Sequence, residues 1–221
     1  MSSSDGPDPA HDSADIPELV WRALERSRAL GLLGPGPVAD HVAHAIAMAG
    51  CVPLPRRFVD LGSGGGIPGL VLAAQWPSVD EHHVGAGHRR IEVLTEAVET
   101  TELGERVVVV EGRAETVARD PAHRGAYDLV VARSFGPPAA TAECAVGFLE
   151  PGGRLLVSEP PEDDPARWPA DGLARLGFGP SEIQVRGGRR YCSLQLVTAA
   201  SDTYPRRVGV PEKRPLWSTS R

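Results

Sequence analysis

The stretch that decides the fold of this chain is Asp60-Leu-Gly-Ser-Gly-Gly-Gly66. The apolar pair Phe58-Val59 precedes it, and a helical pattern begins at Gly69. The order is a strand, an acidic residue, a glycine-rich turn and the start of a helix. Such an arrangement presents bare backbone N–H groups to a nucleotide-like ligand. A turn without a ligand is the alternative, but so many glycines cost chain entropy unless a close approach requires them.

Short apolar segments and helical patterns alternate after the turn. Strands are expected at Phe58-Val59, Val79-Val84, Val107-Val110, Tyr127-Val131, Arg154-Val157, Ile183-Val185 and Tyr191-Val197. Helices are expected at Gly69-Gln75, Arg89-Thr101, Pro138-Leu149 and Asp164-Leu176. This alternation predicts an α/β fold with a doubly wound, seven-stranded, mainly parallel sheet. Gly187-Gly188 separates the last two strands like a hairpin turn, which predicts one antiparallel strand.

The chain divides by composition into four segments. Residues 1–15 are predicted to be a disordered acidic leader, and residues 16–50 to form two helices. Asp15 is the expected N-cap of the first helix, Gly34-Pro-Gly-Pro37 breaks it, and Gly50 closes the second. Residues 51–198 hold the α/β domain, and residues 199–221 are a basic tail.

Bulk composition excludes several classes of protein. The net charge of -6 argues against a generic nucleic-acid binder. Three widely spaced cysteines indicate neither a disulfide framework nor a zinc site. No signal-like or membrane-spanning apolar run is present, so we expect a cytoplasmic protein without a membrane partner.

The spacing of the glycines bears on the kind of cofactor. Gly62-x-Gly64-x-Gly66 differs from the GxGxxG that holds a dinucleotide pyrophosphate, which disfavours an NAD-dependent enzyme. A carboxylate at Asp60 would repel a diphosphate, whereas it would attract the ammonium group of S-adenosylmethionine. The turn therefore favours S-adenosylmethionine as cofactor.

Several ordered motifs extend this prediction. Asp60-Leu-Gly-Ser-Gly-Gly-Gly-Ile-Pro-Gly69 resembles the first motif of the glucose-inhibited division protein B family, the methyltransferases that make 7-methylguanosine in small-subunit ribosomal RNA. The resemblance spans about Gly31 to Trp217. Its other motifs are His88-Arg-Arg90, Gly112-Arg-Ala-Glu115, Val131-Ala-Arg-Ser134, Pro151-Gly-Gly153 and the tail from Tyr204 to Leu216.

The resemblance implies roles for individual residues. It assigns the cofactor to Asp60, Gly62, Ser63, Gly64, Gly66, Gly85, Ala114, Glu115 and Arg133. Arg133 would also lie beside the transferred methyl and the target base, unless it caps a helix or pairs with Asp128. Arg206-Arg207 and Lys213-Arg214 resemble a patch for the RNA backbone, with a solvated tail as the alternative.

Three positions depart from the family pattern. Gly85 stands where an acidic residue usually accepts hydrogen bonds from the cofactor ribose, a loss of about 1.5–3 kcal/mol. Glu159, in Ser158-Glu-Pro160, replaces an expected lysine near the substrate. Ala43-His44 replaces an arginine-histidine pair, and His44 and Glu159 join Arg133 as candidate catalytic residues.

A metal site is not expected. His82, His83 and His88 are close in sequence, but adjacent histidines on a strand point to opposite faces of the sheet. No cysteine or carboxylate completes a chelating arrangement in this pattern.

Three functions remain open on the sequence alone. The first is a methyltransferase acting on guanine in small-subunit ribosomal RNA. The second is a divergent member that binds the cofactor weakly and serves as a partner subunit or a non-methylating enzyme in a specialised biosynthetic pathway. The third is a methyltransferase for a small molecule. Gly85 and Glu159 favour the second function, whereas the intact glycine turn and tail oppose it.

Overall fold

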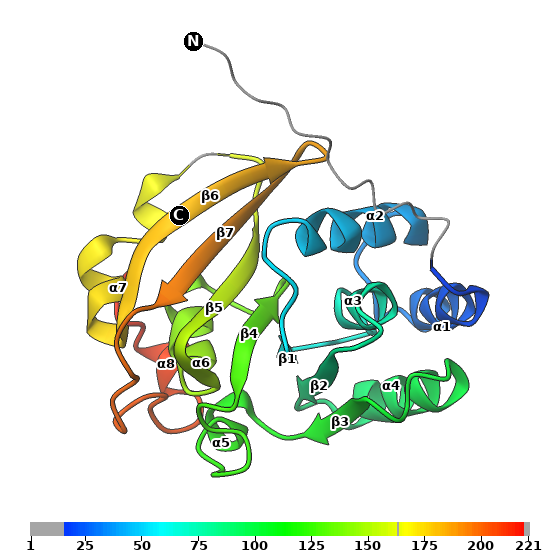
Figure 1. Ribbon diagram of the computed structural model, residues 1–221, viewed down its shortest axis with the longest axis horizontal. Helices are drawn as coiled ribbons and strands as arrows, with labels where there is room; N and C mark the ends of the chain where they lie inside the picture. Colours follow the sequence, from blue (N-terminus) through cyan, green and yellow to red (C-terminus); the bar gives the residue numbers. More distant parts are fainter. Residues whose placement is uncertain (1–15, 163, 219–221) are drawn as a thin grey trace.

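The computed structural model of the chain describes residues 16–162 and 164–218. Its centre is a seven-stranded sheet in the order β3-β2-β1-β4-β5-β7-β6 (Figure 1). The strands are β1 (Arg57–Leu61), β2 (Asp80–Gly85), β3 (Val107–Glu111), β4 (Tyr127–Ala132), β5 (Leu149–Glu159), β6 (Phe178–Arg186) and β7 (Arg189–Leu196). Strands β1 to β5 are parallel, and β7 is antiparallel to both of its neighbours. The predicted doubly wound sheet and its antiparallel hairpin are confirmed.

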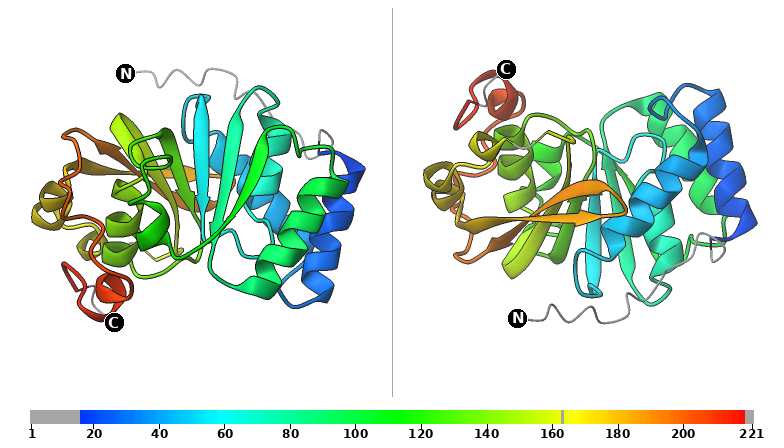
Figure 2. Two further views of the ribbon diagram at one scale, coloured as in Figure 1. Left: turned by 90° about the horizontal axis from the view of Figure 1, so that it is seen from below. Right: turned by 90° about the horizontal axis from the view of Figure 1, so that it is seen from above.

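Helices cover both faces of the sheet (Figures 1 and 2). One face carries α1 (Glu18–Ala29), α2 (Val38–Ala49), α3 (Gly69–Gln75) and α4 (His88–Thr100). The other carries α5 (Ala114–Val117), α6 (Pro138–Val146), α7 (Ala170–Leu176) and α8 (Val210–Lys213). None of the helices in the described residues is long and apolar enough to cross a membrane.

The two N-terminal helices form where the sequence predicts them. Helix α1 follows Pro17, while the expected cap Asp15 and the predicted leader lie outside the described residues. Helix α2 follows Pro37 and ends at Gly50. Proline fits just before or at the first turn of a helix, where its missing N–H has no intrahelical partner.

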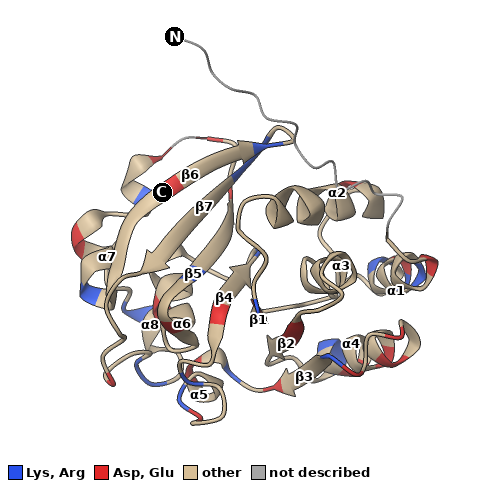
Figure 3. Ribbon diagram, in the orientation of Figure 1, with Lys and Arg blue, Asp and Glu red and all other residues tan. Residues whose placement is uncertain are grey.

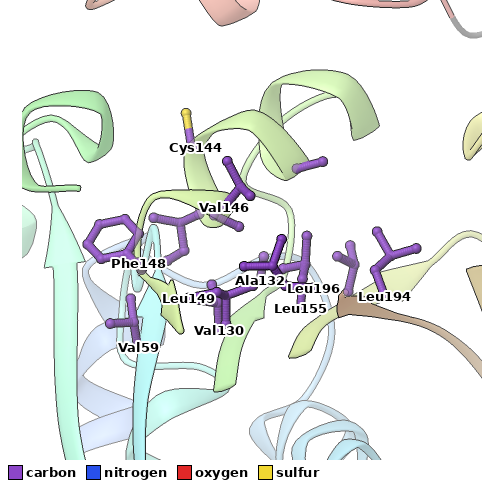
Figure 4. Packing of buried hydrophobic residues seen from close by; sticks show 14 of the residues in the cluster. Val59, Val130, Ala132, Cys144, Val146, Phe148, Leu149, Leu155, Leu194 and Leu196 are labelled. Carbon is purple, nitrogen blue, oxygen red and sulfur yellow. The ribbon is translucent and has the colours of Figure 1, made fainter. Parts of the chain in front are cut away.

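The largest hydrophobic cluster lies between β4, β5 and α6 (Figure 4). Val130, Leu155 and Phe148 are completely buried in it. The three cysteines, Cys51, Cys144 and Cys192, are free and buried. Each Å² of apolar surface buried in this cluster stabilises the fold by about 25 cal/mol. The cluster therefore holds the carboxyl ends of β4 and β5 in a fixed position.

The boundaries of several predicted elements were wrong. The expected helix Pro138-Leu149 ends at Val146, because Gly147 follows and Leu149 already pairs with Tyr127 in the sheet. Strand β5 consequently begins five residues before the expected Arg154.

The expected helix Asp164-Leu176 is divided into a 3-10 turn, Pro165–Arg167, and helix α7. Pro169 lacks the N–H that would continue a helix, so it starts the second segment instead. The expected strand Ile183-Val185 extends over Phe178–Arg186, with a register shift before Ser181. Because β6 is an edge strand, it tolerates Gly179-Pro180 at that irregularity.

Candidate active site at the carboxyl ends of the strands

The glycine turn leaves β1 in a conformation that other residues rarely adopt. Gly62, Gly64 and Gly66 have φ angles of +79°, +53° and +97°. A Cβ on Gly62 would lie 2.6 Å from the ring of Phe135, so this position also needs glycine for space. Ser63 supports the turn by donating its hydroxyl to the carbonyl of Asp60 at 2.8 Å.

The central pocket, of about 280 Å³, lies above the ends of β1, β2 and β3. Gly62, Gly85, Ala114 and Glu115 line it, so four residues assigned to the cofactor by resemblance do meet in one cavity. The sequence interpretation missed further lining residues: Val84, Ala86, Gly112, Arg113, Phe135, Gly136, Pro137, Ala140, Cys144, Pro211 and Glu212. Most of these side chains are small or apolar, a composition suited to a flat heterocycle.

Glu115 connects the central pocket to the C-terminal tail. Its carboxylate is buried and accepts hydrogen bonds from Gly209 N at 2.8 Å and from Arg113 at 3.2 Å. Burial alone would raise the pKa of Glu115, but these hydrogen bonds lower it below its ordinary value. The tail, through Pro211 and Glu212 on α8, thus forms one wall of the pocket.

The turn pocket, of about 210 Å³, lies on the other side of Gly62. Arg90, Arg133 and His41 line it together with residues 62–65, and no carboxylate is among its lining residues in the described chain. Arg133 donates to Nδ1 of His41 at 2.7 Å, and Nε2 of His41 lies 3.1 Å from the carbonyl of Gly34. Two guanidinium groups beside backbone N–H groups make this pocket suited to an anion.

The alternative role weighed for Arg133, a pairing with Asp128, is not the one that the structure has. Asp128 instead accepts hydrogen bonds from the backbone N–H groups of Arg56 and Arg57, at 2.8 and 2.9 Å. Arg133 therefore remains directed at the turn pocket.

His44 does not line the turn pocket, although it was a candidate catalytic residue. Its ring packs against Tyr191 with 5.2 Å between centroids, and burial lowers its pKa to about 4. His41, one helical turn earlier, is the histidine at the site. Helical spacing puts both residues on one side of α2, so only the packing of that helix distinguishes them.

The β5 pocket, of about 300 Å³, lies between the ends of β4 and β5. Glu159 and Arg167 line it, and Arg167 Nε donates to Glu159 Oε2 at 2.6 Å. The glutamate at the lysine position of the family is thus paired with Arg167, a cation eight residues after the end of the strand.

The three pockets share lining residues where they meet. Gly62 belongs to the central and turn pockets, Ser134 to the turn and β5 pockets, and Phe135 to the central and β5 pockets. Ser134 has a φ angle of +56°, an uncommon value for a residue other than glycine. We call the place where Gly62, Ser134 and Phe135 meet the junction.

Asp60 lines none of these pockets. Its carboxylate is buried, accepts a hydrogen bond from Gly69 N at 3.0 Å, and lies 3.5 Å from His83 Nδ1. Glu81 lies 3.1 Å from the other nitrogen of His83. A Cβ on Gly69 would lie within 2.7 Å of all three side chains, so this buried triad packs directly against the start of α3.

The buried triad is the one cluster of potential metal ligands among the described residues. Its two carboxylates face opposite nitrogens of one imidazole, which is the arrangement of an ion-paired histidine rather than of a shared metal. Neighbouring His82 points to the other face of the sheet, where its ring contacts Tyr127, as strand alternation predicts.

Figure 3 marks the lysines and arginines along the ribbon, and those of the basic tail differ in how exposed their side chains are. Arg206 turns inward and binds both oxygens of the fully buried Glu143, so its predicted contact with RNA competes with a structural pair. Arg207, Lys213 and Arg214 are exposed. Trp217 packs against Gly172 and donates to the carbonyl of Arg167, which fixes the end of the tail.

Comparison with known proteins identifies similar chains. Residues 36–161 match the family model "GidB: rRNA small subunit methyltransferase G". The ribosomal RNA small subunit methyltransferase G of Symbiobacterium thermophilum is 36% identical over 79% of this chain and 75% of its own length. The same-named protein of Roseiflexus castenholzii is 34% identical over 73% and 71%.

Solved structures support the fold. An O-methyltransferase from Bacillus cereus, in complex with S-adenosylhomocysteine, has a TM-score of 0.57 at 14% identity. The match covers 81% of this chain and 91% of that one. The arrangement of strands and helices is therefore that of class I methyltransferases.

Proposed function

The chain belongs to the rRNA small subunit methyltransferase G family, and we propose that it transfers a methyl group from S-adenosylmethionine to a guanine of small-subunit ribosomal RNA. The observation that carries this proposal is the junction, where three pockets of different chemistry meet and each of Gly62, Ser134 and Phe135 lines two of them. A methyl donor and a base must meet at one point, and the junction supplies such a point.

Two of the pockets fit the two ends of S-adenosylmethionine. The central pocket, with Ala86, Ala114 and Pro137 on its walls, suits the nucleoside. The turn pocket suits the methionine carboxylate, since Arg90 and Arg133 line it without a competing acid. Gly85 provides no carboxylate for the ribose, and Glu212 is the exposed acid on the pocket wall.

The protein's own contribution is positioning. When bound, S-adenosylmethionine supplies an electrophilic methyl group on a sulfonium. A purine ring nitrogen is already nucleophilic, so the site needs alignment and exclusion of water rather than a strong base. Phe135, packed on Gly62, gives the junction an apolar wall that serves both purposes.

A non-methylating subunit and a small-molecule methyltransferase are not favoured as alternatives. The relatives that carry the ribosomal RNA name cover most of this chain and are themselves mostly covered by it. RNA would approach across the exposed Arg207, Lys213 and Arg214 of the tail, where cations suit phosphates.

The test combines binding with activity. Calorimetric titration with S-adenosylhomocysteine should show saturable binding that is weakened in Arg133→Ala. Small ribosomal subunits lacking the modification should then accept labelled methyl groups, and cleavage at 7-methylguanosine should locate the product. Binding without transfer to ribosomal subunits would contradict the proposed substrate, and absence of binding would contradict the proposed reaction.

A further inference from the structure

The β5 pocket contains two buried polar atoms that have no partner. Glu159 uses Oε2 to bind Arg167, while its Oε1 is buried without a hydrogen bond in the described chain. Trp168 Nε1, on the same pocket, is also buried without one. The side chain of Glu159 is only 3% exposed. An unpaired buried carboxylate oxygen is costly, so this pocket is built to receive a ligand with hydrogen-bond donors.

The donors and acceptors of the pocket match one base. Glu159 Oε1 is an acceptor, and the indole N–H of Trp168 and the guanidinium of Arg167 are donors. The Watson–Crick edge of guanine offers the reverse pattern, because N1–H and the N2 amino group donate and O6 accepts. Adenine does not match, because its N1 is an acceptor and would face the carboxylate of Glu159, which is also an acceptor.

We propose that the β5 pocket binds the target guanine by its Watson–Crick edge, with Glu159 accepting from N1–H and the N2 amino group. This inference rests on the proposed function and deepens it. Unstacked bases of RNA are commonly read at this edge, which is free only in a single strand or after the base leaves the helix.

The same orientation leaves the reactive atom in the right place. N7 lies on the opposite side of the purine from N1 and N2, so it faces away from Glu159. Ser134, Phe135 and Gly136 border the β5 pocket on the side it shares with the other two pockets. A guanine held at Glu159 therefore presents N7 toward the junction.

Arg167 makes a buried carboxylate acceptable at this position. It neutralises Glu159 through Oε2, and Trp217 Nε1 donates to the Arg167 carbonyl, so the tail holds the 3-10 turn in place. The Glu159–Arg167 pair therefore has its geometry before the base binds, and it can recognise the base without rearranging.

The experiment compares guanosine and inosine monophosphates, which differ only in the N2 amino group. Their affinities are measured by NMR titration of the protein loaded with S-adenosylhomocysteine. The wild-type protein should prefer guanosine by about tenfold, the value of one hydrogen bond to a charged group. Glu159→Gln should abolish the preference and lower kcat/KM on ribosomal subunits, with unchanged affinity for S-adenosylhomocysteine.

Glu162→Gln is the matched control, because this exposed acid lies three residues away and should change neither quantity. Thermal melting establishes that Glu159→Gln is folded, and Trp168→Phe provides a second test of the same pocket by weakening guanosine and inosine equally. A preference for guanosine that survives in Glu159→Gln would overturn the pocket assignment alone. A wild-type protein that neither binds S-adenosylhomocysteine nor methylates subunits would overturn the proposed function and this inference together.

Discussion

Arg133 is held by His41, whose Nδ1 accepts a hydrogen bond from its guanidinium at 2.7 Å. Nε2 of the same ring lies 3.1 Å from the carbonyl of Gly34, so a proton on Nε2 satisfies both contacts. His41 is buried, and the pair links α2 to the end of β4. An N-terminal helix that precedes the sheet in sequence therefore sets the direction of Arg133, a residue that lines the turn pocket.

Replacing His41 should consequently impair the site rather than the fold. His41→Ala leaves Arg133 without its acceptor, and we expect affinity for S-adenosylhomocysteine to fall ten- to a hundredfold, the equivalent of about 1.5–3 kcal/mol. Calorimetric titration measures this loss. Asp40→Ala, at the exposed neighbouring position, is the control and should bind normally. Equal affinities in His41→Ala and the wild type would show that Arg133 is positioned without the histidine.

Restoring the ribose carboxylate should strengthen cofactor binding. Gly85 lies at the end of β2 on the wall of the central pocket, and an added Cβ would meet only Ile91 Cδ1, at 3.2 Å. We expect Gly85→Asp to tighten S-adenosylhomocysteine binding about tenfold through hydrogen bonds to the ribose hydroxyls. Gly85→Ala adds the Cβ without the carboxylate and should not tighten it. If both variants bind alike, the ribose does not lie at Gly85.

The buried triad should give the protein an unusual dependence on pH. Burial raises the pKa of Glu81 from its ordinary 4.5 to about 7. Burial alone would lower the pKa of His83, but Glu81 and Asp60 raise it. In both cases the folded state holds protons that the unfolded state releases, so these groups stabilise the fold at low pH and lose that effect as pH rises.

The comparison with Glu81→Gln isolates this effect. His44 and His82, whose pKa values burial lowers to about 4, act in the opposite direction but are common to both proteins. The stability of the wild type relative to Glu81→Gln should therefore decline between about pH 4.5 and 7, by on the order of 3 kcal/mol. Urea unfolding at several pH values measures the difference. A difference that stays constant with pH would mean that Glu81 is ionised throughout.

Sequence patterns predicted the sheet because its signals are local. Glycine spacing, apolar strand segments and Gly187-Gly188 depend on neighbours in the chain, and the structure reproduces their order. The same patterns failed at Leu149 and at Pro165–Arg167, where tertiary pairing and proline decide the boundaries.

The site was less accessible to sequence reasoning. Gly62, Gly85, Ala114 and Glu115 meet as expected, since the carboxyl ends of parallel strands share an edge. The choice of His41 over His44, the pairing of Glu159 with Arg167, and the inward turn of Arg206 depend on contacts between distant segments. No spacing in the sequence encodes those contacts directly.

The two arginines at the start of the tail should behave differently when replaced. Arg206 binds Glu143 through its side chain and its backbone N–H, and Glu143 is fully buried. Removing one partner of such a pair leaves an uncompensated buried charge, so Arg206→Ala should lower the free energy of unfolding by about 3–5 kcal/mol. Arg207 is exposed, and Arg207→Ala should change stability by less than about 0.5 kcal/mol. Urea unfolding of both variants measures the contrast.

RNA binding by folded protein should depend on these two positions in the reverse order. Replacing Arg207 should affect the binding of RNA, whereas replacing Arg206 should not. Each phosphate contact adds close to one to the slope of log affinity against log salt, so Arg207→Ala should reduce that slope by about 1 on ribosomal RNA. Arg206 is committed to Glu143, and folded Arg206→Lys protein, which keeps the charge beside that acid, should retain the wild-type slope. A salt slope that is unchanged in Arg207→Ala would place the RNA backbone elsewhere on the protein. A slope reduced in Arg206→Lys would instead show that the inward arginine leaves Glu143 to bind phosphate.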